Sequence, residues 1–368
     1  MNRLIFILLI SLTTGSFAQK VSYSNQIVNS TDANIIAIRE QWKLYIKDCM
    51  MTYISKNDES LHKYWSNSDV ETKYSTIAMF QFSDNVPAPF YGEMVTYDIT
   101  KLDNDFYRLK TIIISSDSIS KGVIANFTLF ADISDNKVKF ISYLQNKESQ
   151  LNSYTTTHIK YLYSDNFSFS RKEARRAEKL YIQLLSDFNI DATNKITYIV
   201  SNELDEANKL IGFDYSVRSS ALKDAGYYMQ KSNIILSCQV AHLHELVHVV
   251  LRSKYPNAPR LFHEGIATYW GGTNEKEYKF HLKMLKEIAN NQENIDFSNF
   301  NEWEKIIDNK TNPFYTIGAI FIDYAYKLGG QEKVEALFKS EDDINTTLQD
   351  ELGINDTDAF IKNYLNNE

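Results

Sequence analysis

The sequence contains little of several residue types whose abundance marks particular classes of protein. Of its 368 residues, 5 are proline and 12 are glycine, whereas 24 are tyrosine and 21 are phenylalanine. Because disordered chains are poor in aromatic residues and rich in proline, this composition predicts a compact globular protein. No segment after the N-terminus has the ~20 apolar residues of a membrane-spanning helix, so we expect no membrane span in the mature chain.

Positive charge and cysteine are also scarce. Lys and Arg number 39 against 47 Asp and Glu, a formal net charge of −8. Since nucleic-acid binding and attachment to anionic membranes depend on clustered positive charge, we expect neither. The two cysteines, Cys49 and Cys238, can pair in an exported protein or remain as free thiols, and the sequence leaves both alternatives open.

Residues 1–18 have the pattern of an export signal. Arg3 gives a basic start, Leu4 to Leu12 form a short apolar core, and the small residues in Ser16-Phe17-Ala18 offer a cleavage site before Gln19. The residue directly after that site is Gln19 rather than a cysteine, which argues against a lipid anchor. We therefore expect an exported protein, either secreted or periplasmic.

The rest of the chain divides into two regions of different patterning. In residues 19–150, apolar residues at helical spacing over Ala33–Ser55 precede four β-like runs. These runs are Tyr91–Thr100, Phe106–Ser115, Gly122–Ala131 and Val138–Gln145. One long helix before an antiparallel meander predicts a small α+β domain of unknown role, similar in element order to the NTF2-like cone.

Residues 151–368 begin with alternating strands and helices and end with helices alone. The predicted strands are His158–Tyr163 and Lys195–Val200, with a hairpin of Gly226–Gln230 and Ile234–Ser237. The predicted helices are Arg171–Phe188, Glu203–Ile211, the run around residues 240–251, Glu277–Asn290, Glu302–Asp308, Pro313–Leu328, Glu332–Lys339 and Thr357–Asn366. We expect a mixed α/β lobe followed by an all-helical lobe.

The stretch His244-Glu245-Leu246-Val247-His248 carries the clearest chemical signal. Residues four apart lie on one face of a helix, so the imidazoles of His244 and His248 can bind one Zn²⁺. Glu245 adjoins the first ligand and can accept a proton from a water molecule that the metal polarises. The spacing therefore predicts two metal ligands and a general base.

Glu264 is the predicted third ligand. It lies 264 − 248 = 16 residues after His248, within a second apolar run that reads as a helix. Two His and one Glu leave one coordination position open, which is typical of catalytic zinc sites rather than structural ones. We therefore expect one zinc ion per chain.

At these residues the chain resembles the gluzincin metallopeptidases, the thermolysin-like branch of the zincins. In that family HExxH lies on one helix and the third ligand is a Glu on a following helix. The sequence Glu264-Gly265-Ile266-Ala267 is similar to the EGxA motif of many bacterial peptidase-MA-like domains. The resemblance covers residues from about 154 onward and implies a zincin-type catalytic domain that cleaves a peptide or protein substrate.

The resemblance also implies a tyrosine that donates to the developing oxyanion. Tyr315, in the segment 312–319, matches that position, and ordinary packing is the alternative. One residue departs from the pattern, because Thr268 stands where thermolysin has an Asp that orients a zinc-bound His. The hydrogen bonds that orient the ligands are therefore not predicted.

The preferred prediction is an exported zinc peptidase to which an extended peptide adds as a strand near Tyr227-Tyr228-Met229. The alternatives are a zinc hydrolase of a non-peptide amide and an inactive protein that binds zinc or peptide. His242 precedes His244 by two residues and points to nearly the opposite side of the helix, which favours a packing role. His263 adjoins Glu264 and either packs, orients that ligand or contacts substrate.

Overall fold

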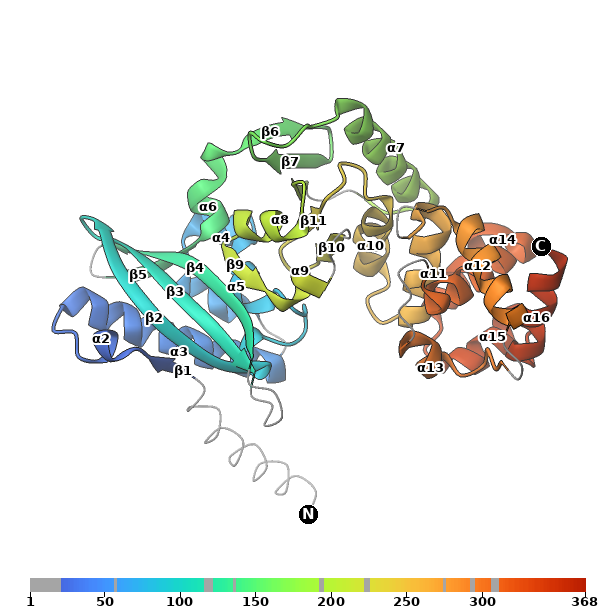
Figure 1. Cartoon of the computed structure of the whole chain (residues 1–368), viewed down its shortest axis with the longest axis horizontal. Helices are drawn as coiled ribbons and strands as arrows, with labels where there is room; N and C mark the ends of the chain where they lie inside the picture. Colours follow the sequence, from blue (N-terminus) through green and yellow to red (C-terminus); the bar gives the residue numbers. More distant parts are fainter. Residues whose placement is uncertain are drawn as a thin grey trace, which may run out of the picture.

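The computed structural model describes residues 21–55, 58–115, 122–134, 137–191, 195–221, 226–273, 276–291, 295–305 and 311–368. The predicted export signal, residues 1–18, lies outside the described residues. The fold is α+β, as predicted, with two mixed sheets followed by a mostly helical region. Figure 1 shows the first sheet, the second sheet and the C-terminal helices arranged in a row along the molecule.

The first sheet packs against one long helix, α3 (Ala33–Ser55), which has the predicted bounds. Every second side chain of β3 is buried, among them Tyr107 and Leu109. These side chains join the apolar cluster around Trp42 and Tyr45 of α3, so the alternating pattern of the strand faces the helix. The strands run in the order β1 (Val21–Tyr23), β2 (Gly92–Asp103), β3 (Phe106–Ser115), β4 (Val123–Ser134) and β5 (Lys137–Ser142).

The second sheet contains the predicted hairpin at one edge. Its strand order is β10-β11-β8-β7-β6, and β10 pairs antiparallel with β11 alone. Strand β8 runs parallel to both of its neighbours, β11 and β7, and β6 pairs antiparallel with β7. The bounds are β6 (Asn152–Thr155), β7 (Ile159–Tyr163), β8 (Ile196–Val200), β10 (Gly226–Met229) and β11 (Ile234–Ser237).

Both faces of the second sheet are buried. Tyr198 of β8 packs in the cluster that contains Ala177 and Leu184 of α7 (Arg171–Asp187). Its neighbour Ile199 joins the other cluster, with Leu204 of α8 (Leu204–Leu210). Because helices cover both sides, β8 reads as a continuous apolar run rather than an alternating one.

A strand from beyond residue 150 belongs to the first sheet, and a carboxylate from before residue 150 contacts the hairpin turn of the second sheet. Strand β9 (Phe213–Ser216) pairs with β4, although it lies far beyond that strand in the sequence. The carboxylate of Asp84 accepts the backbone N–H groups of Gln230 and Lys231 at 3.3 and 2.9 Å. The N-terminal region therefore holds the turn between β10 and β11, and the predicted domain boundary near residue 150 stays a prediction.

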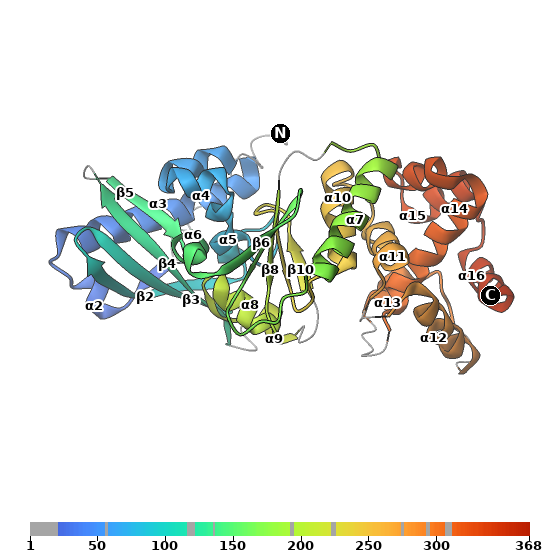
Figure 2. The same ribbon diagram turned by 90° about the horizontal axis from the view of Figure 1, so that it is seen from above.

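The C-terminal part is helical. Figure 2 shows α7 and α10 between the second sheet and the remaining C-terminal helices. These helices are α10 (Leu243–Lys254), α11 (Arg260–Gly271), α12 (Tyr278–Asn291), α13 (Phe300–Lys305), α14 (Pro313–Lys339), α15 (Ile344–Leu352) and α16 (Thr357–Asn367). Short helices elsewhere are α2 (Asn25–Val28), α4 (Asn67–Glu71), α5 (Ile77–Phe80), α6 (Tyr143–Lys147) and α9 (Val217–Ala221). Among the described residues, no helix has the length and apolar character needed to cross a membrane.

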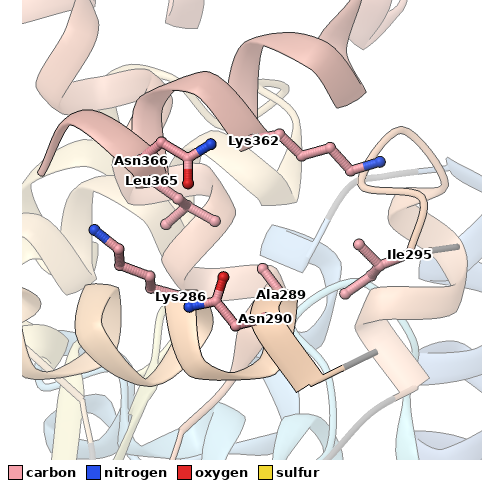
Figure 3. Close-up of a pocket in the computed structure, with 7 residues that line it drawn as sticks. All are labelled: Lys286, Ala289, Asn290, Ile295, Lys362, Leu365 and Asn366. Carbon is pink, nitrogen blue, oxygen red and sulfur yellow. The ribbon is translucent and has the colours of Figure 1, made fainter. Parts of the chain in front are cut away.

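One cavity of about 240 Å³ lies between α12 and α16 (Figure 3), and its lining includes no residue of α10. Lys286 and Lys362 are its charged lining residues, and neither a histidine nor a carboxylate lines it. Metal chemistry requires other donors, so the candidate site lies elsewhere.

Candidate metal centre

Helix α10 holds the HExxH segment in the interior of the protein. Leu246, Val247 and Val250 are almost fully buried in the apolar cluster that α7 and α14 share. The same helix buries His244, Glu245 and His248, whose exposed fractions are 6, 8 and 3 %. Buried polar groups are costly unless they are paired or bound to a metal, so this concentration of them needs a chemical explanation.

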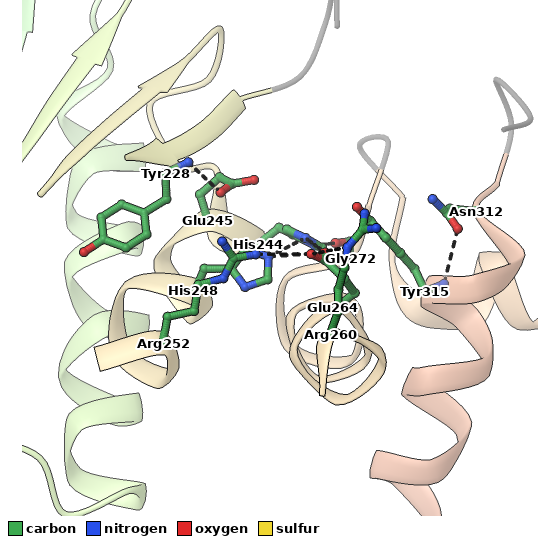
Figure 4. Close-up of polar contacts among 10 residues, drawn as sticks. All are labelled: Tyr228, His244, Glu245, His248, Arg252, Arg260, Glu264, Gly272, Asn312 and Tyr315. Carbon is green, nitrogen blue, oxygen red and sulfur yellow. Dashed lines mark hydrogen bonds and ion pairs between the residues drawn. The ribbon is translucent and has the colours of Figure 1, made fainter. Parts of the chain in front are cut away.

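Three side-chain atoms that can bind a metal ion, from two helices, meet beside α10 (Figure 4). Nε2 of His244 and Nε2 of His248 are 3.2 Å apart. Oε2 of Glu264, on α11, lies 3.2 Å from the first of these nitrogens and 3.3 Å from the second. Ligands of a tetrahedral zinc ion at about 2.0–2.1 Å lie about 3.3 Å from one another. The three atoms therefore form a triangle of the size that one zinc ion requires.

Glu245 lies beside this triangle and is held by the edge strand. Its Oε2 accepts the backbone N–H of Tyr228, on β10, at 2.9 Å. Among the described residues, donor atoms of His244, Glu245 and His248 fall within 4.8 Å of one another and can hold a metal ion. Glu264 makes the shorter contacts to both imidazoles, so Glu245 is the carboxylate left to act on a substrate or water.

The backbone carbonyl of Gly272 orients the first histidine. Nδ1 of His244 donates to this oxygen at 2.8 Å, which leaves the lone pair of Nε2 directed at the site. Gly272 has a φ of 73°, a left-handed conformation that favours glycine. The preceding Gly271 lets α11 approach α10, because a Cβ there would lie 2.3 Å from the backbone nitrogen of His244.

The hydroxyl of Thr268 does not orient either histidine by a hydrogen bond. Thr268 is fully buried, and within the described part of the chain its Oγ1 has no hydrogen-bond partner. Nδ1 of His248 is likewise buried without a partner there. The Nδ1 atom of His244 is therefore held by a carbonyl, whereas a hydrogen bond does not hold the Nδ1 atom of His248.

The contacts within the triangle and its burial shift the pKa values of its three side chains. Burial disfavours a charge on His244, but the carboxylates of Glu264 and Glu245 outweigh it and raise the pKa of this imidazole. Burial lowers the pKa of His248 to about 3. Burial opposes ionisation of Glu264, yet the two imidazoles hold its pKa well below the usual value. An ionised carboxylate thus lies buried between two imidazoles, an arrangement in which a bound metal cation can take the place of a proton.

Tyr315 also lies at this site. It belongs to the first turn of α14, where the side chain of Asn312 accepts its backbone N–H at 3.3 Å. Its ring stacks on the ring of His244, with centroids 5.7 Å apart and an angle of 20° between the planes. Burial and the nearby Glu264 carboxylate raise the pKa of Tyr315, so its hydroxyl keeps the proton that a hydrogen-bond donor needs.

Close contact between two glycines brings α11 and α14 together. A Cβ on Gly265 would lie 2.3 Å from the carbonyl carbon of Gly318, and one on Gly318 would lie 2.3 Å from the oxygen of Leu261. Gly265 follows Glu264, and Gly318 is one turn after Tyr315. Gly265 therefore allows the close crossing of α11 and α14 that places the side chains of Glu264 and Tyr315 at the site.

Gly265→Ala should destabilise the protein by about 1–3 kcal/mol, because the added methyl group overpacks a backbone contact. Denaturant unfolding of the purified variant measures this change in the free energy of unfolding. Gly122→Ala is the matched control, since a Cβ there meets nothing within 4 Å, and it should change stability by less than about 0.5 kcal/mol. Equal stabilities of the two variants would contradict the proposed crossing.

The other residues singled out in the sequence lie outside the triangle. Nδ1 of His242 lies 3.1 Å from the Ser237 hydroxyl, and burial lowers the pKa of His242 to about 3. Nε2 of His263 donates to the carbonyl of Tyr255 at 2.9 Å, and its ring packs edge-on against Phe338. Cys49 and Cys238 do not form a disulfide.

A second cavity, of about 290 Å³, opens beside the first histidine. His244, Gly271, Gly272 and Ala241 line it, together with charged side chains that include Arg176. Of the three residues of the triangle, His244 lines this cavity, whereas His248 and Glu264 do not.

Comparisons with known proteins do not identify the chemistry of this site. The sequence matches no model of a known protein family, and no curated protein is significantly similar to it. The assignment of chemistry therefore depends on the geometry of the residues themselves.

Proposed function

We propose that this protein is an exported zinc-dependent peptidase of gluzincin type. The observation that carries the proposal is the triangle of His244 Nε2, His248 Nε2 and Glu264 Oε2, with sides of 3.2–3.3 Å. Glu245 beside it supplies a carboxylate that is not needed as a ligand. Export is supported by the signal-like residues 1–18.

His244, His248 and Glu264 would hold the ion. When bound, Zn²⁺ supplies a positive charge that polarises the scissile carbonyl and lowers the pKa of water. Three protein ligands leave a position for that chemistry, whereas a fourth would close the site. Two imidazoles and one carboxylate form a ligand set that suits zinc.

Glu245 moves the proton. It accepts a proton from the attacking water, whose oxygen forms a bond to the carbonyl carbon. The C–N bond then breaks, and the same carboxylate returns the proton to the leaving amine. Burial raises the pKa of Glu245, which makes it a better acceptor than an exposed carboxylate. The N–H of Tyr228 fixes one of its oxygens.

The edge strand β10 supports a peptide as substrate. In an antiparallel pair, the N–H and C=O of one residue point to the same side. Because the N–H of Tyr228 points at Glu245 rather than at β11, its carbonyl also faces outward. An extended peptide can pair with that carbonyl as an added strand, a mode that tolerates many sequences.

Metal content is the first test. Protein purified without chelators or metal-affinity columns should contain about one zinc per chain, since one set of three ligands is present. A strong chelator should remove the ion and the activity together, and added zinc should restore both. Elemental analysis measures the content, and substoichiometric zinc that cannot be restored would refute the proposal.

A digest of a mixed peptide library separates the proposed activity from its alternatives. Cleavage that stops after chelation identifies a peptidase. Zinc at full occupancy with turnover only of small non-peptide amides would make the protein an amidohydrolase. Zinc at full occupancy without any turnover would leave a binding protein.

A further inference from the structure

The carboxylate of Glu264 has a second oxygen that faces away from the imidazoles. The NH2 nitrogen of Arg252 lies 3.3 Å from this Oε1 (Figure 4). Oε2 of the same carboxylate contacts both histidines. Each oxygen therefore has a separate partner, and the two partners stand on opposite sides of one carboxyl group.

The position of Arg252 follows from the same helical spacing as the ligands. It lies four residues after His248 and eight after His244, so all three side chains project from one face of α10. Gln230, in the turn of the hairpin, donates from Nε2 to the backbone carbonyl of Arg252 at 3.4 Å. Helix geometry and this anchor thus direct the guanidinium toward α11.

Arg260 also approaches Glu264, but in a different setting. Its Nε lies 3.8 Å from Oε1, and its side chain is 53 % exposed, compared with 31 % for Arg252. An exposed pair at this distance is screened by water and contributes little. The shorter and less exposed contact is the one that can fix the carboxylate.

We propose that Arg252 is a positioning residue for the third metal ligand. It occupies Oε1, so Glu264 presents a single oxygen to the ion at a fixed orientation. This inference rests on the proposed function, because it assumes that the triangle binds zinc. Groups that hold metal ligands in place typically change metal affinity about 10–100-fold when removed.

Zinc affinity, measured by competition with a chromophoric chelator, tests the proposal. Arg252→Gln should weaken zinc binding about 10–100-fold, and Arg252→Lys should lose less, because it keeps the charge but not the planar fork. Lys254→Gln is the matched control: it removes a charge from the same helix, but its partner is Glu335, so zinc affinity should be unchanged. Thermal unfolding without zinc verifies that each variant folds.

The effect of Arg252→Gln on zinc affinity is also measured in the Glu264→Ala variant. This second measurement distinguishes a positioning role of Arg252 from the direct effect of its charge on the metal ion. Arg252 carries a positive charge, which by itself repels a cation. In Glu264→Ala there is no carboxylate to position, so adding Arg252→Gln should leave zinc affinity unchanged or increase it. The coupling between the two sites is the difference between these two effects.

Three outcomes would overturn the inference. Wild-type protein that binds zinc while Arg252→Gln binds it equally well or more tightly would show that Glu264 needs no positioning. Equal losses in both backgrounds would show that Arg252 acts through another group. A wild-type protein that binds no zinc would remove the proposed function, and this inference with it.

Discussion

Glu245→Gln should bind zinc like the wild-type protein and lose about 10²–10⁴-fold in kcat, the usual contribution of a general base. The amide has the shape of the carboxylate, and its oxygen can still accept the N–H of Tyr228. It cannot accept a proton from water at neutral pH. The metal, the fold and the edge strand should therefore survive while the proton transfer is lost.

Zinc content and steady-state hydrolysis of a cleaved library peptide measure the two effects separately. Glu335→Gln is the control, because Glu335 bonds to Tyr255 and to lysines away from the triangle, and it should keep wild-type kcat. Loss of zinc in Glu245→Gln would instead make Glu245 a ligand, which its 4.8 Å grouping with the two histidines also allows. Unchanged kcat would remove Glu245 from the reaction.

The spacing of apolar residues predicted those helices and strands that are determined mainly by their own local sequence. The helix at residues 33–55 and the hairpin of β10 and β11 follow directly from apolar spacing and from the polar turn between two apolar runs. Helix α15 was missed, although Asp343 caps its start and Gly353 ends it in a left-handed conformation. These capping residues were the available signal.

Contacts between distant segments could not be predicted in this way. The pairing of β9 with β4 joins residues such as Ala125 and Ser216, which are 216 − 125 = 91 positions apart, and nothing in either strand specifies its partner. The two predicted helices at 313–328 and 332–339 form α14, whose axis is interrupted where Gly329 and Gly330 leave helical geometry. A pair of glycines predicts a break, but packing decides whether the helix resumes.

The same distinction applies to the site. The spacing of His244 and His248 is a property of one helix, so the sequence alone was enough to predict their proximity. That Glu264 reaches them depends on the crossing of α10 and α11. The carbonyl of Gly272 and the N–H of Tyr228 have no sequence signature, because every residue carries those groups.

Tyr315→Phe should keep zinc and fold while kcat falls about 10²–10³-fold, the cost of removing one donor to a developing oxyanion. The ring stacks on His244, and phenylalanine preserves that packing. The loss should appear mainly in kcat rather than in KM, because the negative charge on the carbonyl oxygen develops only in the transition state.

Comparison with a second tyrosine of the same helix makes this test specific. Tyr326 of α14 also uses its hydroxyl, accepting from Trp270 and donating to Gln331, but its contacts lie far along the helix from His244. Tyr326→Phe should therefore leave kcat unchanged, even if stability falls slightly. If Tyr315→Phe behaves in the same way, Tyr315 contributes packing around the first ligand, and the bound metal remains the main source of positive charge for the oxyanion.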